Sequence, residues 1–167
     1  MQNTGKLKLT TRGEREIVMT REFEAPRKLV FDAFTEPELI RQWLLGPAGW
    51  SMPVCEVDLR VGGRYRYVWR HINGNEMGMG GVYREIVPPE RIVATEKFDE
   101  SWYPGEAIGT VILAEQAGKT TVTQTVLYDS RDTRDAVLKS PMESGVAAGY
   151  DRLEQILSSL KSNGRKA

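Results

Sequence analysis

The sequence predicts an α+β domain in which an antiparallel sheet curves around one long C-terminal helix. Residues 140–162, placed on a helix, carry their apolar side chains in a stripe about 100° wide, as amphipathic helices do. Residues 52–128 instead form alternating segments joined by short turns, and short connections imply antiparallel pairing. A sheet with one solvated face buries the other, and only the C-terminal helix, roughly 30 Å long, can cover it.

Composition limits the classes of function that the chain can have. The 23 basic and 23 acidic residues cancel, so we expect neither nucleic-acid binding nor a polybasic membrane-surface patch. The single cysteine, Cys55, and the single histidine, His71, exclude an internal disulfide and a Cys/His zinc site. No apolar run reaches the ~18 residues of a membrane span, and residues 1–12 lack the apolar segment of a signal peptide. We therefore predict a cytoplasmic protein without membrane insertion, metal or cofactor.

The N-terminal part predicts one strand and two short helices. A chain of 167 residues fits a single domain. Three parts are expected: a tail or edge strand at residues 1–13, the domain at 14–162 and a tail at 163–167. Residues 16–24 alternate as a strand. Pro26 and Pro37 then each suit the first turn of a short helix, where a missing N–H costs nothing.

The middle of the chain reads as a series of strands. They are expected at residues 52–59, 64–70, 76–87, 91–97, 107–116 and 119–128. Gly62-Gly63 and Asn73-Gly74 supply the positive φ angles that two-residue hairpin turns need. Glycines inside residues 76–87 mark where the sheet can bend sharply or carry a bulge.

One residue of the C-terminal helix does not fit its apolar stripe. Gly149 lies between Val146 and Leu153, where a larger side chain is expected. A glycine inside a helix costs roughly 1 kcal/mol relative to alanine. Either another part of the chain packs closely against Gly149, or the missing side chain leaves room for a ligand.

Several motifs resemble those of one known family. They are residues 25–37 (APRKLVFDAFTEP) followed by Trp43, residues 58–65 (DLRVGGRY), residues 81–92 (GVYREIVPPERI), residues 134–136 (RDA) and residues 149–153 (GYDRL). In this order they resemble the family related to the C-terminal domain of the activator of Hsp90 ATPase, within the START/Bet v 1-like group. The resemblance implies a helix-grip fold, in which a curved antiparallel sheet of six to seven strands wraps the C-terminal helix and encloses an apolar cavity.

The resemblance leaves three functions open, because such domains include ligand carriers, co-chaperones and cyclase-like enzymes. The first is binding of a small apolar, aromatic or lipid-like molecule in the cavity. The second is a stress-response module that contacts a chaperone or another protein. The full activator has an additional N-terminal domain for which this chain has no room, which favours a role other than stimulating Hsp90. The third is a cyclase- or hydrolase-type enzyme that uses polar groups in the cavity.

Large aromatic and methionine side chains are the candidate lining of the cavity. They suit a pocket for an apolar molecule, because tyrosine and tryptophan add polar tips and methionine adapts its shape. With their neighbours on the C-terminal helix, the predicted lining residues are Trp43, Trp50, Tyr65, Tyr67, Trp69, Met77, Met79, Tyr83, Trp102, Met142, Val146, Gly149, Tyr150 and Leu153. The alternative for each is an ordinary place in the core. No residue is predicted to be catalytic.

Other reactive or charged residues have ordinary structural interpretations. His71 is expected to be a solvated residue at a hairpin end, and Cys55 a buried, inert thiol. One set of charged residues fits cross-strand ion pairs on the solvent face or, alternatively, a polar cluster at the cavity mouth: Glu56, Asp58, Arg64, Arg66 and Arg70.

Overall fold

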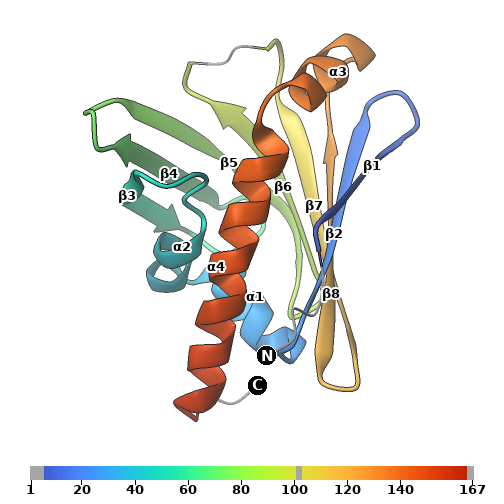
Figure 1. The fold of residues 1–167 in the computed structure, drawn as a ribbon. Coiled ribbons are helices and arrows are strands. Elements are labelled where there is room, and N and C mark those ends of the chain that lie inside the picture. Colours follow the sequence, from blue (N-terminus) through green and yellow to red (C-terminus); the bar gives the residue numbers. More distant parts are fainter. Residues whose placement is uncertain (1–5, 101–102, 165–167) are drawn as a thin grey trace.

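The computed structural model describes residues 6–100 and 103–164 and shows an α+β fold (Figure 1). The strands are β1 (Lys8–Arg12), β2 (Glu16–Phe23), β3 (Trp50–Val57), β4 (Arg64–His71), β5 (Glu76–Val87), β6 (Arg91–Phe98), β7 (Ala107–Gln116) and β8 (Lys119–Leu127). The helices are α1 (Arg27–Thr35), α2 (Pro37–Trp43), α3 (Arg131–Lys139) and α4 (Met142–Ser162). The predicted fold class, with two short helices near the start and a long last helix, is confirmed.

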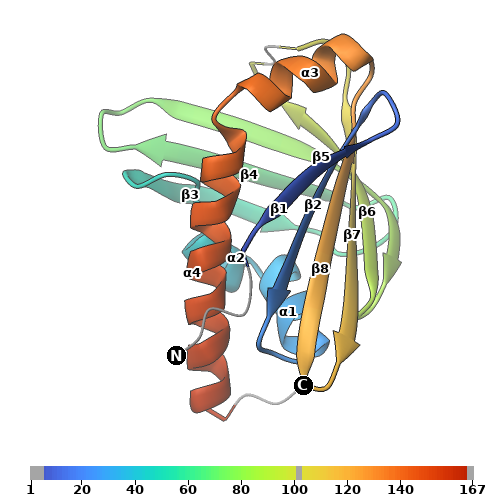
Figure 2. The same cartoon turned by 45° about the vertical axis from the view of Figure 1, so that its right-hand side comes forward.

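All the described strands belong to one curved antiparallel sheet. Their order is β1-β2-β8-β7-β6-β5-β4-β3. Figure 2 shows the sheet curling so that α4 lies along its concave side, which is the predicted helix-grip arrangement. The described part of the chain holds eight strands instead of six to seven. The additional strand is β1, where residues 8–12 pair with β2 as an edge strand and not as a tail.

The sheet bends at β5 in a different way from that predicted. Its pairing with β6 shifts between Tyr83 and Glu85, so the irregularity follows the glycines and does not fall on them. Gly81 instead allows a close approach between strands, because a Cβ there would overlap the backbone carbonyl of Thr95 on β6. The glycine is therefore needed for close contact between the two backbones.

The two edges of the sheet are β1 and β3. β1 is five residues long, and four of those residues are exposed. β3 carries Pro53 in the segment where its register with β4 is irregular, between Ser51 and Val54. Proline lacks an N–H and is accommodated on edge strands and at bulges, so its position fits the edge that β3 forms.

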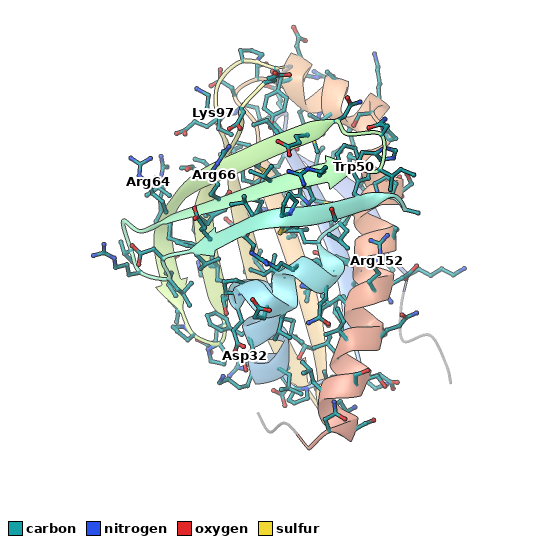
Figure 3. The ribbon with its side chains drawn as sticks, turned by 90° about the vertical axis from the view of Figure 1, so that its left-hand side faces the viewer. Asp32, Trp50, Arg64, Arg66, Lys97 and Arg152 are labelled. Carbon is teal, nitrogen blue, oxygen red and sulfur yellow. The ribbon has the colours of Figure 1, made fainter. Side chains whose placement is uncertain are left out.

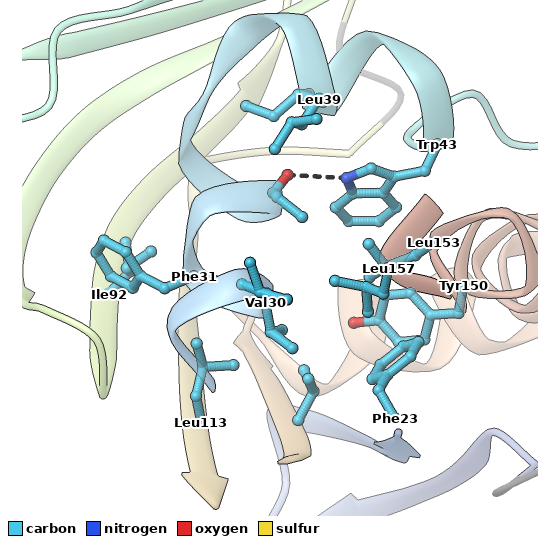
Figure 4. Close-up of a cluster of buried hydrophobic side chains, with 14 of the residues drawn as sticks. Phe23, Val30, Phe31, Leu39, Trp43, Ile92, Leu113, Tyr150, Leu153 and Leu157 are labelled. Atoms are coloured by element: carbon cyan, nitrogen blue, oxygen red, sulfur yellow. Dashed lines mark hydrogen bonds between the residues drawn. The ribbon is translucent and has the colours of Figure 1, made fainter. Parts of the chain in front are cut away.

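The core lies where α1 and α2 meet the C-terminal half of α4 (Figure 4). Its side chains that are at most 1% exposed include Phe23, Leu29, Val30, Leu153 and Leu157. The indole Nε1 of Trp43 donates a 2.9 Å hydrogen bond to the carbonyl of Ala33, which joins α2 to α1. The two short helices therefore form one packed unit that closes this end of the concave face.

Candidate ligand-binding cavity

Small residues on the inner face of the sheet leave space beside the N-terminal half of α4. Alternate residues of each strand point to the same face, so Gly109 and Leu113 of β7 both point inward. Leu113 is buried in the core, whereas Gly109 has no side chain. On β6, the small side chain of Ala94 lies between the larger inward side chains of Ile92 and Glu96. The space that remains is a cavity of about 510 Å³ between the sheet, α2 and α4.

One wall of the cavity is aromatic and is held by hydrogen bonds. Its members on β4 and β5 are Tyr65, Tyr67, Trp69 and Tyr83. The ring centroids of Tyr65 and Tyr67 are 5.0 Å apart, and those of Tyr67 and Trp69 are 5.8 Å apart. The Tyr65 hydroxyl donates to the carbonyl of Thr95 at 2.6 Å, and Trp69 Nε1 donates to the carbonyl of Leu44 at 2.7 Å. These bonds fix the rings and tie the wall to β6 and to the end of α2.

Most of the residues predicted to line a cavity lie on its wall. Twelve of the fourteen do so: Trp43, Trp50, Tyr65, Tyr67, Trp69, Met77, Met79, Tyr83, Met142, Val146, Gly149 and Tyr150. Leu153 does not line it, because it is fully buried in the core one turn further along α4. Trp102 lies outside the described residues.

Gly149 has a close neighbour on one side and also faces the cavity. A Cβ on Gly149 would lie 3.1 Å from the carbonyl oxygen of Trp43, so α4 packs closely on the end of α2. Gly149 also lies on the cavity wall. The part of the chain that packs closely against Gly149 is therefore the end of α2.

The sequence-based prediction missed the polar end of the cavity, and Glu96 is its most important residue. The side chain of Glu96 points inward from β6 and lines the cavity. It lies over Gly109 of β7, where a Cβ would overlap the carboxyl group. Burial raises the pKa of Glu96 to about 7. The carboxyl group is surrounded by protein, and the surface that it retains faces the cavity.

The second polar group of the cavity is a hydrogen-bonded pair of side chains that joins α4 to β8. The Tyr150 hydroxyl donates a 2.7 Å hydrogen bond to Oε1 of Gln124 on β8. Both residues line the cavity, and burial raises the pKa of Tyr150 well above its ordinary value. The bond uses the amide oxygen of Gln124 and not its N–H groups.

Comparison with known protein families gives a clear assignment. The model of the family described as "Activator of Hsp90 ATPase homolog 1-like protein" matches residues 24–158. The chain belongs to this family. No curated protein sequence matches the chain.

Solved structures with the same fold include relatives of this family member. A protein from Rhodobacter sphaeroides is 29% identical with a TM-score of 0.88, and the match covers 93% of this chain and 99% of that one. The protein CV1439 from Chromobacterium violaceum is 30% identical with a TM-score of 0.72, over 84% of this chain and 96% of that one. An Hsp90 activator from Plasmodium falciparum is 22% identical with a TM-score of 0.62, over 86% of this chain and 96% of that one, and shows the fold alone.

The charged residues predicted to lie either on the solvent face or at the cavity mouth lie on the outer face of the sheet. Arg66 forms an ion pair with Asp99, in which Nη2 lies 2.6 Å from Oδ2, and this bond holds the pKa of Asp99 below its ordinary value. Arg70 pairs with Glu76 at 2.6 Å. Figure 3 shows Arg64 and Arg66 pointing away from the concave side. Surface ion pairs of this kind contribute little stability, typically about 0–1 kcal/mol each.

His71 and Cys55 take no part in the cavity wall. The ring of His71 packs against Trp50, with centroids 5.0 Å apart, and its Nδ1 accepts a hydrogen bond from the backbone N–H of Asn73. His71 is therefore partly packed, and not simply solvated as predicted. Cys55 is buried, which raises its pKa to about 11, so that the unreactive thiol form predominates at neutral pH.

Two searches of residues 6–100 and 103–164 concern other kinds of site. None of the helices in these ranges combines the length and apolar character needed to cross a bilayer. In the same ranges, no group of three or more His, Cys, Asp or Glu side chains is placed to hold a metal ion.

Proposed function

We propose that this protein binds a small, mainly apolar molecule in the cavity between α4 and the sheet. The cavity volume, about 510 Å³, carries the proposal, because binding sites for small molecules range over roughly 300–1,000 Å³. Aromatic and methionine side chains dominate the wall, while Glu96 and Gln124 supply a few polar groups. Such a combination binds the body of a ligand by apolar contact and orients it by hydrogen bonds.

The direct test is to look for a bound molecule and for a site that can be blocked. Protein purified under mild conditions should carry a small-molecule ligand in native mass spectrometry. The neutral fluorescent probe prodan (6-propionyl-2-dimethylaminonaphthalene) should bind with one-to-one stoichiometry. Ala94→Phe fills space on the wall and should abolish this binding, because Ala94 lines the cavity.

The matched control is Ala114→Phe, which places the same ring on the exposed outer face of β7. It should bind the probe as the wild type does. Equal binding by the wild type and by Ala94→Phe would refute the cavity as the site. Circular dichroism and thermal melting establish that both variants are folded.

A protein partner is the second candidate, favoured by membership of a family named after an activator of Hsp90 ATPase. It is tested by adding the purified protein to Hsp90 and measuring co-purification and the ATPase rate. A change in the rate that persists in Ala94→Phe would support a surface interaction that does not depend on the cavity. No change in the rate would count against this candidate.

Acid–base catalysis in the cavity is the third candidate, and Glu96 is the observation that favours it. Its pKa of about 7 allows it both to release and to accept a proton near neutral pH. A compound that is converted by the wild type and left unchanged by Glu96→Gln, but still bound by that variant, would support catalysis.

A further inference from the structure

The cavity holds one ionisable acid among its described lining residues, apart from the weakly acidic tyrosines. Glu96 shares the inward face of β6 with Ala94 and Phe98, so its carboxyl group is placed in apolar surroundings. No basic side chain lines the cavity in the part of the chain that the structure describes. Desolvation is the cause of the raised pKa of Glu96, and no cation among residues 6–100 and 103–164 opposes it.

The titratable groups around Glu96 on neighbouring elements are hydroxyls. They come from β4, the loop before β7, the residue after β8 and α4: Tyr65, Tyr67, Tyr103, Tyr128 and Tyr150. Burial raises the pKa of every one, so all are neutral at pH 7. Arg21 of β2 opposes part of the rise in the pKa of Tyr150. The charge of Arg21 is itself paired with Asp151 of α4, at 2.8 Å. The charge of an ionised Glu96 is therefore uncompensated inside the cavity.

We infer that the cavity takes a hydrophobic amine, whose ammonium group binds the Glu96 carboxylate while its apolar body packs on the aromatic wall of β4 and β5. This inference rests on the proposed function and names its ligand class. A buried carboxylate is costly unless it is paired, and a ligand cation supplies the missing partner. The faces of the tyrosine and tryptophan rings carry negative potential and attract the same cation.

Space and position also favour this arrangement. Gly109 leaves room for the carboxyl group between β6 and β7, where any larger residue would displace it. The hydroxyls of Tyr65 and Tyr67 lie within electrostatic range of the carboxylate, so its binding region adjoins the aromatic wall. A cation at this point stabilises the ionised form of Glu96 and lowers its pKa.

The test compares two probes of the same shape. Naphthalen-2-ylmethylamine carries an ammonium group, and naphthalen-2-ylmethanol carries a neutral hydroxyl in its place. At pH 8 the wild type should bind the amine about tenfold more tightly than the alcohol, because the carboxylate is ionised and faces the cation. Glu96→Gln should remove this preference while still binding the alcohol. Isothermal titration calorimetry measures both dissociation constants.

The matched control is Glu56→Gln, which removes the same charge from the exposed outer face of β3. It should keep the tenfold preference, because that preference comes from the cavity and not from the net charge. In the wild type, affinity for the amine should rise between pH 6 and pH 8, while affinity for the alcohol stays flat or falls. This pH dependence tests the inference without a variant, should Glu96→Gln fail to fold.

The possible failures distinguish the inference from the proposed function. Equal binding of both probes, or a preference that survives Glu96→Gln, overturns the amine while a cavity that binds small molecules remains. Stronger binding of the alcohol that weakens as the pH rises assigns Glu96 as a neutral hydrogen-bond donor and also overturns it. If neither probe binds but the neutral probe prodan does, the amine is again excluded. If none of the three binds, the proposed function falls too.

Discussion

The concave face of the sheet has two halves that use the same strands and the same helix but are filled differently. Beside the C-terminal half of α4, Leu153 and Leu157 are fully buried against α1. Beside the N-terminal half, Gly145 and Gly149 carry no side chain, and the cavity occupies the space. The first half is packed with buried apolar side chains, whereas in the second the apolar side chains line the cavity.

The difference comes from side-chain volume and not from polarity alone. On β7, Leu113 fills the core half while Gly109 opens the cavity half. On β8, the fully buried Val122 is followed on the same face by Gln124, which turns to the cavity. A cavity can therefore arise on a continuous apolar face when a few inward positions become small. The stability of the domain should then depend mainly on the filled half.

The largest expected effect is a cavity made in the filled half. Leu153→Ala should lower the free energy of unfolding by about 3–4 kcal/mol, because a fully buried leucine loses both transfer energy and contacts. Val146→Ala, on the cavity wall and half-buried, should cost at most about 1 kcal/mol. Urea denaturation measures both changes. Equal costs would remove the distinction between the two halves.

A smaller effect should appear in the pH dependence of stability. The pKa of Glu96 is raised from its ordinary value of 4.5 to about 7, so the folded chain keeps a proton that the unfolded chain has released. Stability that is fully present below pH 4.5 is therefore lost as the pH rises to about 7. The stability of the wild type relative to Glu96→Gln should fall by roughly 3 kcal/mol across this window. A difference that stays constant with pH in urea denaturation would contradict the buried position of the carboxyl group.

The fit of Glu96 over Gly109 predicts an energetic coupling. Gly109→Ala should destabilise the protein by about 1–2 kcal/mol, because its Cβ would overlap the Glu96 carboxyl group. In a Glu96→Ala background the same change should cost little, since the overlapping group is gone. A double-mutant cycle by thermal unfolding measures the coupling. Additive costs would mean that the two residues do not share the space.

The smallest effect separates two glycines of α4. Gly145→Ala should stabilise the protein by about 0.5–1 kcal/mol, since alanine favours the helix and its Cβ would make ordinary contacts with Pro47. Gly149→Ala should gain less, because its Cβ would lie 3.1 Å from the carbonyl oxygen of Trp43. Thermal unfolding gives both values. If Gly149→Ala were the more stabilising of the two, the end of α2 would have to move aside at little cost to make room for the new Cβ.

Local patterns predicted most of the fold and one wall of the cavity. Alternation placed Tyr65, Tyr67 and Trp69 on one face of a strand, and the structure shows them side by side. Gly62 and Gly74 have the predicted positive φ values, +86° and +94°. The turns themselves are longer than the predicted two residues, because the connections span residues 58–63 and 72–75. These features depend on neighbours in sequence, so a single chain is enough to predict them.

The polar end of the cavity depends on contacts between distant segments, and the prediction missed it. The prediction did not include Glu96, because the residue stands next to Lys97 in a charged stretch of the sequence. Ala94 and Phe98, two residues away on either side, share its face of the strand and indicate that it points inward. The loop that follows α2 also lines the cavity, through Leu45 and Pro47 among others. Its course is set by packing on α4 and by the bond from Trp69 to Leu44, which no local pattern reveals.

The two edge strands of the open sheet, β1 and β3, affect how readily this protein aggregates at high concentration. An uncovered border strand presents free backbone groups on which another chain can add a strand and begin an aggregate. Pro53 removes one such donor from β3 and interrupts its regular spacing, while β1 is short and largely polar. These features oppose strand pairing between the edges of two molecules, although the sheet does not close into a barrel.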